Sequence, residues 1–329
     1  MTVFSVLDLS PIPAGSTAAD ALSNSLSLAQ HCERVGYHRY WVAEHHNMRG
    51  IASAATAIVI NHIAAGTTQI RVGSGGIMLP NHAPLMVAEQ FGTLEALHPG
   101  RIDLGLGRAP GTDGVTAQAL RRTLQSDPNQ FPRDVLELKG YLAEAASQQQ
   151  VVAVPGHGAQ VPLYILGSSL FGAQLAAILG LPFAFASHFA PQAMLRAIAL
   201  YRQEFEPSEQ LSEPYVILGY NICAADTHER AEYLRSSGLR ALLNLRSGKP
   251  GPLPAPEENF YAQLSADEQA MIEQLSVASA VGDSAAVRTQ VMDFLQQTGA
   301  DELIVAGQIF DHQARCDSYA IAHEACAGL

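Results

Sequence analysis

The sequence has few cysteines and no long apolar run, and each shortage excludes a class of protein. The four cysteines in 329 residues stand far apart and form no CxxC pair: Cys32, Cys223, Cys316 and Cys326. Neither a zinc knuckle nor a disulfide framework is expected, and we predict buried free thiols. No stretch reaches the roughly 18 uncharged apolar residues that a membrane-spanning helix needs.

Basic residues are also scarce. Lysine and arginine number 19 against 31 aspartate and glutamate residues, which gives a formal net charge of −12. Nucleic acids and anionic membrane surfaces attract basic patches, so we expect neither as a partner. The first residues lack the basic segment and small-residue cleavage site of a secretory signal, which favours a cytoplasmic protein.

What the chain does have is a large apolar fraction, 48% of residues, arranged in strand-like and helix-like runs that alternate almost throughout. The strand candidates are residues 4–9, 40–43, 70–75, 101–106, 161–166, 183–186, 215–224 and 302–305. With helical runs between them, they predict a single (β/α)8 TIM barrel over residues 1–329, with a doubly wound open sheet as the alternative. Segments 109–130 and 248–266 are expected to be flexible loops or excursions from the barrel.

Glycines gather where the third predicted strand ends, at Gly75 and Gly76. A dinucleotide fingerprint would need a helix to start within the glycine run, but Pro80 and Pro84 prevent a helix before position 84. We expect these glycines to bring bare backbone against the face of a flat ring. The alternative is an ordinary turn that closes a barrel strand.

Glu44 and His45 directly follow the second predicted strand, at the carboxyl end where a barrel places its functional residues. A histidine suits proton transfer near neutral pH, and Glu44 could orient its ring. The alternative is a structural His–Glu pair. Neighbouring histidines point in different directions and no HExxH or HxH spacing is present, so no metal site is predicted.

A third candidate site lies where the fifth predicted strand meets a helix, at Ser168 and Ser169. Free N–H groups and hydroxyls at a helix N-terminus favour a phosphate, although Ser169 could equally be a simple N-cap. Arg108, after the fourth strand, could add a bidentate contact to the same phosphate or form a rim salt bridge.

Several motifs, in order along nearly the whole chain, resemble the bacterial luciferase-like flavin monooxygenases, and most of all their bacterial luciferase-like oxidoreductase subgroup. They are EHH at 44–46, GSGGIMLPNHAP at 73–84, AEQFGTLEALHPGRIDLGLGR at 88–108, LGSS and GLPFAF within 166–185, and GDSAAVRTQVMDFLQQTGADELIV at 282–305.

This resemblance implies a (β/α)8 barrel, usually dimeric, that binds FMN or the deazaflavin F420 at the carboxyl ends of its strands. In the family, reduced flavin reacts with O2 to give a peroxide that oxidises a substrate. By position, Glu44 and His45 match the active-site acid and histidine. Gly75–Gly76 match a strand end that often carries a non-proline cis peptide beneath the flavin, and Arg108, Ser168 and Ser169 match the phosphate side. Luciferase has a reactive cysteine where this chain has Gly107, which argues against light emission.

The resulting hypothesis is a monooxygenase that uses reduced FMN and O2 on a small organic substrate. Because no NAD(P)H fingerprint is present, a separate flavin reductase is expected to supply the reduced flavin. The alternatives are an F420-dependent oxidoreductase, which the low count of 19 basic residues disfavours, and a non-catalytic flavin-binding protein. A homodimer through the apolar helices at 53–65 and 84–97 is expected from the resemblance.

Overall fold

The computed structural model describes residues 2–109, 114–120, 130–145 and 148–329. Its strands are β1 (Val3–Asp8), β2 (Arg39–Val42), β3 (Arg71–Met78), β4 (Ile102–Gly107), β5 (Leu163–Gly167), β6 (Phe183–Phe185), β7 (Val216–Ala224), β8 (Ser279–Gly282) and β9 (Glu302–Ala306). Its α-helices are α1 (Ala18–Val35), α2 (Thr56–Ala65), α3 (Pro84–Leu97), α4 (Gly114–Leu120), α5 (Phe131–Leu142), α6 (Leu170–Leu179), α7 (Met194–Glu204), α8 (His228–Arg246), α9 (Ala266–Ser276), α10 (Ser284–Thr298) and α11 (His312–Ala325). Short 3-10 turns cover Leu79–Asn81, Pro191–Ala193 and Phe260–Gln263.

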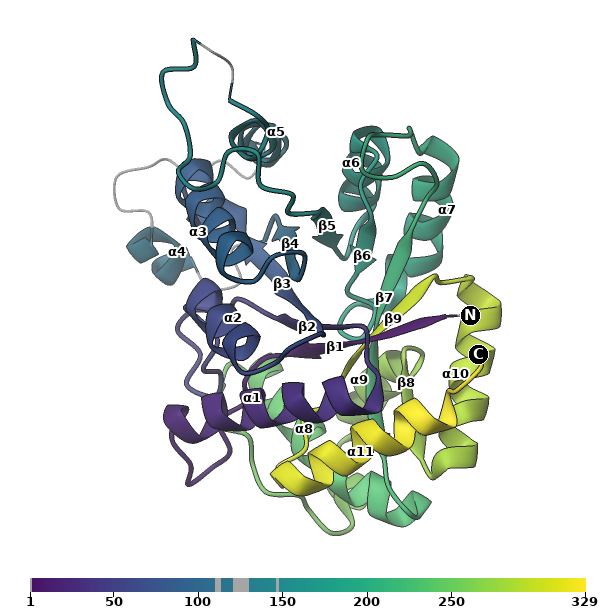
Figure 1. The fold of residues 1–329 in the computed structure, drawn as a ribbon. Coiled ribbons are helices and arrows are strands. Elements are labelled where there is room, and N and C mark those ends of the chain that lie inside the picture. The colour runs from purple at the N-terminus through teal and green to yellow at the C-terminus, as the bar shows by residue number, and fades with distance from the viewer. Residues whose placement is uncertain (1, 110–113, 121–129, 146–147) are drawn as a thin grey trace.

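The strands form a closed parallel barrel. The sheet order is β6-β5-β4-β3-β2-β1-β9-β7-β8, and an additional pairing of β6 with β7 closes it, with Phe183 opposite Val216. Strands β1 to β7 and β9 therefore make the barrel, while β8 pairs in parallel with the distal half of β7. The helices surround this ring (Figure 1). The predicted (β/α)8 barrel is confirmed, and the open-sheet alternative is wrong because β6 meets β7.

Local sequence signals explain where many helices begin and end. Thr17 caps α1 through a reciprocal capping box with Asp20, and Gly36 ends the helix in the left-handed conformation at φ 103°. Asp283 caps α10 by accepting a hydrogen bond from the Ala286 N–H. Leu329 accepts a hydrogen bond of 2.7 Å from the Thr2 N–H, so the two ends of the chain lie side by side (Figure 1). Among the described residues, no helix is long and apolar enough to cross a membrane.

The barrel strands match the predicted ones closely, but three elements were not predicted. Helix α4 lies inside the predicted 109–130 loop, of which residues 110–113 and 121–129 fall outside the described structure. Helix α9 and strand β8 stand between α8 and α10. Strand β3 also runs on to Met78 instead of ending at Gly75, because its pairing with β4 resumes at Ile77 after an irregularity.

Residues 248–266 leave the barrel between α8 and α9 and pack back onto it. Leu253 is buried, pairs with Pro13, and donates its N–H to the Ile12 carbonyl oxygen. Four residues further along the segment, Glu257 forms a bidentate ion pair with Arg240 of α8, with N–O distances of 2.7 and 2.9 Å. The segment thereby lies against the loop that follows β1.

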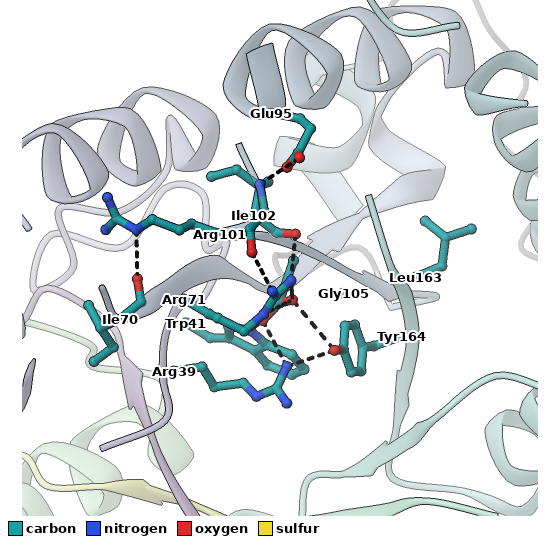
Figure 2. Close-up of polar contacts among 12 residues, drawn as sticks. Arg39, Trp41, Ile70, Arg71, Glu95, Arg101, Ile102, Gly105, Leu163 and Tyr164 are labelled. Atoms are coloured by element: carbon teal, nitrogen blue, oxygen red, sulfur yellow. Dashed lines mark hydrogen bonds and ion pairs between the residues drawn. The ribbon is translucent and has the colours of Figure 1, made fainter. Parts of the chain in front are cut away.

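The interior of the barrel is charged at the amino ends of its strands. Arg39 is ion-paired with Asp103 at 2.8 Å and with Glu302 at 2.9 Å, and all three are buried. Arg71 also reaches Asp103, and Trp41 donates its indole N–H to the same carboxylate. Figure 2 shows the Arg39 and Arg71 guanidinium groups with Trp41 and Tyr164 converging inside the ring.

Above this charged layer lies an apolar one. A buried cluster joins the inward-facing residues of six barrel strands: Leu7, Trp41, Ala43, Tyr164, Ala184, Ile217, Ile304 and Ala306. These two layers fill the barrel and leave its carboxyl end to carry a site, as in other barrels of this kind.

Candidate active site

The glycine run of β3 forms a local irregularity at the carboxyl end of the barrel. The peptide bond between Gly75 and Gly76 is cis, and the register of β3 against β4 shifts between Ser74 and Ile77. Ser74 bridges the gap: its hydroxyl donates to the Gly105 carbonyl at 2.9 Å and accepts from the Gly105 N–H at 3.0 Å. The non-proline cis peptide expected from the resemblance is therefore present.

Side chains would not fit at these glycines. A Cβ on Gly75 would lie 2.6 Å from Leu7 Cδ1 and 3.1 Å from Trp41 Cβ, both in the apolar interior layer. A Cβ on Gly76 would lie 2.6 Å from the Gly105 carbonyl oxygen. Bare backbone thus caps the apolar layer at this point, which is the surface that a flat aromatic ring needs.

Glu44 is the centre of a buried hydrogen-bonded cluster. Its carboxylate accepts bonds from His46 Nε2 at 2.7 Å, from His82 Nε2 at 2.9 and 3.0 Å, and from the Met78 N–H at 3.1 Å. Burial raises the pKa of Glu44, but these bonds and the charge of His82 outweigh it and leave the pKa below its usual range. The cluster holds an ionised carboxylate beside the glycine irregularity.

The sequence analysis paired Glu44 with His45, whereas the hydrogen bonds described here join Glu44 to His46 and His82. His82 was missed because it lies 38 positions from Glu44 in the chain, and only the fold brings the two together. The ligand atoms of Glu44, His46 and His82 lie within 4.8 Å of one another, a spacing that would also suit a metal ion. Three donor groups, His46, His82 and the Met78 N–H, already account for the geometry of the carboxylate without one.

His45 lies in the loop after β2, two positions beyond Ala43 of the apolar interior layer. Its Nδ1 is buried and has no hydrogen-bond partner among the described residues. Burial lowers the pKa of His45, an effect that the charge of Glu44 partly reverses. The site therefore contains a neutral imidazole with unused hydrogen-bonding capacity.

Arg108 and the start of α6 lie together at the carboxyl ends of β4 and β5. The Arg108 guanidinium stacks over the Phe171 ring, 4.3 Å from its centroid, in the first turn of α6. Ser169 is the N-cap of α6 but its side chain makes no capping hydrogen bond. Ser168 is exposed beside it. The predicted plain N-cap bond at Ser169 is absent among the described contacts, so its hydroxyl stays available to an anion.

A family model for luciferase-like monooxygenases matches residues 2–302 of this chain. The chain belongs to the luciferase-like monooxygenases. A luciferase-like monooxygenase of Escherichia coli strain K12 is 54% identical over 319 residues, which cover 97% of this chain and 95% of that protein. The crystal structure of apo-MsnO8 superposes with a TM-score of 0.91 at 35% identity, and covers 99% of this chain and 98% of its own.

More distant luciferase-like structures share the fold and hold two kinds of cofactor. The oxygenating component of 3,6-diketocamphane monooxygenase from Pseudomonas putida, solved with FMN, has a TM-score of 0.71 at 14% identity and covers 98% of this chain and 97% of its own. An F420-dependent secondary alcohol dehydrogenase, solved with an F420–acetone adduct, has a TM-score of 0.69 at 14% identity and covers 99% of each chain. The fold therefore accommodates both flavin and deazaflavin.

Within this luciferase-like enzyme, the predicted residues come from four strand ends of one barrel. Glu44 and His45 follow β2, Gly75 and Gly76 lie in β3, Arg108 follows β4, and Ser168 and Ser169 follow β5. Since parallel barrel strands all end on the same side, these residues share one mouth. The arrangement brings a histidine, a bare backbone platform, and an arginine beside a helix N-terminus to neighbouring positions around the barrel mouth.

Proposed function

We propose that this protein binds FMN, with reduced FMN as co-substrate, and uses O2 to oxidise a small organic molecule. The observation that carries the proposal is the pairing of Arg108 with the uncapped N-terminus of α6, next to the Gly75–Gly76 backbone. A flavin mononucleotide has a phosphate at one end and a flat ring at the other, and these two features match its ends.

The phosphate would sit at α6. Arg108 supplies a fixed positive charge whose position the Phe171 ring supports by stacking. The Ser168 and Ser169 hydroxyls and the free N–H groups of the first turn supply donors. Charge and donors together favour a dianionic group over a neutral one.

The ring would lie over the glycine backbone of β3, where a Cβ at Gly76 would already collide with the Gly105 carbonyl oxygen. When bound, reduced flavin supplies the electrons that activate O2. His45 would hold or move a proton there with its unpartnered imidazole, while Glu44 keeps His46 and His82 in place beside the ring. Loops at the mouth would exclude water from the reaction.

An F420-dependent oxidoreductase on the same barrel is the second candidate, because F420 is bound by a protein of this fold. F420 carries a long acidic tail, and the chain has only 19 basic residues for a net charge of −12. A non-catalytic flavin-binding protein is the third candidate. The Glu44 cluster and His45 argue against it, since a pure binding protein needs no proton-handling groups.

We also propose the partners that this chemistry requires. A separate reductase would supply reduced flavin in the cytoplasm, where the four buried free cysteines would stay reduced. A homodimer would cover the apolar side chains exposed on α2 and α3, which include Ile58 at 72%, Met86 at 58% and Leu97 at 60% exposure. Light scattering of the purified protein measures its oligomeric state.

Titrating the protein with FMN, riboflavin and F420 tests the cofactor proposal, with oxidised and reduced forms compared. We expect FMN to bind more tightly than the other two. Arg108→Met should weaken FMN binding roughly tenfold to a hundredfold, the loss of one charge-assisted contact, and leave riboflavin binding unchanged. Arg133→Met, which removes an exposed arginine from α5, is the matched control. Tighter binding of F420, or equal loss of FMN and riboflavin binding, would reject the assignment.

A further inference from the structure

A further histidine, His188, lies in the barrel mouth on the segment that follows β6. The backbone around His188 is fixed to β7: Ser187 donates its hydroxyl to the Gly219 carbonyl at 2.6 Å, and Asn221 donates its side-chain amide to the His188 carbonyl at 2.7 Å. Ser187 and Gly219 are buried. These bonds hold His188 against β7 by contacts that do not involve its ring.

The imidazole of His188 lies on the β7 backbone inside the barrel. A Cβ on Gly219 would lie only 2.0 Å from His188 Nδ1, so the ring occupies the space that the missing side chain leaves. Gly219 lies two positions after Ile217 in β7, so the two residues face the same side of the strand. Ile217 belongs to the apolar interior layer, so this side faces the inside of the barrel. Only glycine at position 219 allows the ring to sit where it does.

His188 and His45 differ from the other histidines of the site. His46 and His82 are hydrogen-bonded to Glu44. In contrast, the Nδ1 atoms of His45 and His188 are both buried, and neither forms a hydrogen bond with any residue in the described parts of the chain. Because the His188 Nδ1 atom lies against the Gly219 backbone, Nε2 is the ring nitrogen left for a ligand, and it can donate or accept one hydrogen bond according to the tautomer.

The protonation states of the two rings determine which kind of ligand group they can bind. Burial, reinforced by the nearby His45, lowers the pKa of His188 to about 4, and burial lowers that of His45 as well. Both rings are therefore neutral near pH 7. Glu44, the carboxylate whose charge acts on His45, already accepts hydrogen bonds from His46, His82 and the Met78 N–H. Among the described residues, no opposite charge beyond Glu44 is found to act on either ring, so a charged ligand would lose its hydration there without compensation.

We propose that His188 contacts the substrate, and that His188 and His45 together hold a neutral polar group of it, such as an amide, a hydroxyl or a ketone. The proposal rests on the proposed function, because it places the substrate over a flavin in this mouth. Each ring offers the ligand one donor or acceptor nitrogen, so the two together suit an oxygen that only accepts, as in a ketone, or a group that also donates, as in an amide or a hydroxyl. A carboxylate or an ammonium is the poorer ligand.

Nitrogen-15 NMR of histidine-labelled protein tests this directly, with N-methylacetamide, acetate and methylammonium as probes, with and without FMN. His188→Gln and His45→Gln identify the two ring signals. We expect N-methylacetamide to shift both signals at concentrations at least tenfold lower than either ion, and His188→Gln to weaken the response of His45 at least tenfold. No response to N-methylacetamide in either state, or a preference for an ion, would overturn the proposal.

Gly219→Ala provides a second variant, because its Cβ would displace the His188 ring without removing it. It should weaken the probe response as His188→Gln does, whereas Gly140→Ala on the exposed face of α5, with nothing within 4 Å, should not. Thermal unfolding shows whether each variant folds, and His188→Gln decides if Gly219→Ala does not. FMN binding is read in the same samples: a probe response without FMN binding would reject only the proposed cofactor, and FMN binding without a probe response only the role of His188.

Discussion

At the scale of single residues, the site divides its histidines between two tasks. His46 and His82 bond to the Glu44 carboxylate and so have fixed orientations, while the Nδ1 atoms of His45 and His188 are buried without a partner in the described structure. An imidazole that is already bonded to a carboxylate orients its neighbours, and one with a spare nitrogen can exchange a proton with a ligand. This division supports our proposal that His45 handles a proton.

His45→Ala should lower turnover by about a hundredfold or more, the usual contribution of a general acid or base. FMN affinity should stay within severalfold, because the proposed phosphate contacts lie at α6. Oxygen consumption with supplied reduced FMN, together with an FMN titration, measures both. His62→Ala, which removes an exposed histidine from α2, is the control. Unchanged turnover in His45→Ala would refute the role.

His188 should make stability depend on pH in the acid range. The pKa of its ring is about 4 in the folded protein, against about 6.5 when unfolded, so only the unfolded chain takes up this proton between those values. Stability is therefore lost as pH falls from 6.5 toward 4, by about 3 kcal/mol over the window. His188→Gln should flatten that part of the curve in urea unfolding at a series of pH values. An unchanged slope would mean that the ring is not neutral in the folded state.

At the scale of elements, the glycine irregularity in β3 positions both the platform and the Glu44 cluster. Because β3 continues past Gly76, the Met78 N–H reaches the Glu44 carboxylate. Ser74 replaces the interrupted pairing with β4 through its two hydrogen bonds to Gly105. The side-chain cluster and the backbone platform therefore depend on the same short stretch of β3, from Ser74 to Met78.

Gly76→Ala tests this dependence. The new Cβ would lie 2.6 Å from the Gly105 carbonyl oxygen, a backbone atom that moves only if β4 moves. We expect a loss of about 1–3 kcal/mol in the free energy of unfolding and a large loss of FMN affinity. Gly140→Ala in α5 is the matched control and should stabilise the protein by about 0.5–1 kcal/mol, as alanine does in a helix. Denaturant unfolding and FMN titration give both numbers, and normal FMN binding by Gly76→Ala would contradict the platform.

Elements with strong local signals were predictable from the sequence, and those without were not. The barrel strands are apolar runs bounded by glycine and proline, and the sequence places all of them. Strand β8 is only four residues long, and α9 has few buried positions, although the capping box of Ser265 and Glu268 marks its start. His46 lies two positions from Glu44, but His82 and the Met78 N–H reach Glu44 only because the fold brings the segment after β2 to the end of β3, which no local pattern encodes. His188 was not predicted as a site residue for the same reason, since only the fold brings its ring against Gly219.

At the scale of the whole molecule, the two ends of the barrel carry different kinds of side chains and so contribute to different properties. The amino ends of the strands carry a network of two arginines and two carboxylates, Arg39, Arg71, Asp103 and Glu302, with compensating charges. This network links β2, β3, β4 and β9 across the interior. The carboxyl ends carry the glycine platform and the histidines. Because the network lies below the apolar layer, changes in it should affect folding and leave the chemistry of the mouth intact.

Arg39→Met should show this separation most clearly. Arg39 is buried and bonds to Asp103, Glu302 and the Tyr164 hydroxyl, so its removal leaves two buried carboxylates with fewer partners. We expect a loss of about 3–5 kcal/mol in the free energy of unfolding, the usual result of breaking a buried ion pair on one side. The folded fraction should keep normal FMN affinity, because the proposed phosphate site at α6 and the glycine platform lie at the other end of the barrel. Urea unfolding and an FMN titration measure the two quantities, with Arg133→Met as the control for loss of an exposed arginine. A stability change below about 1 kcal/mol would show that the network does not hold the barrel together, and weakened FMN binding at full folding would show that the two ends are coupled.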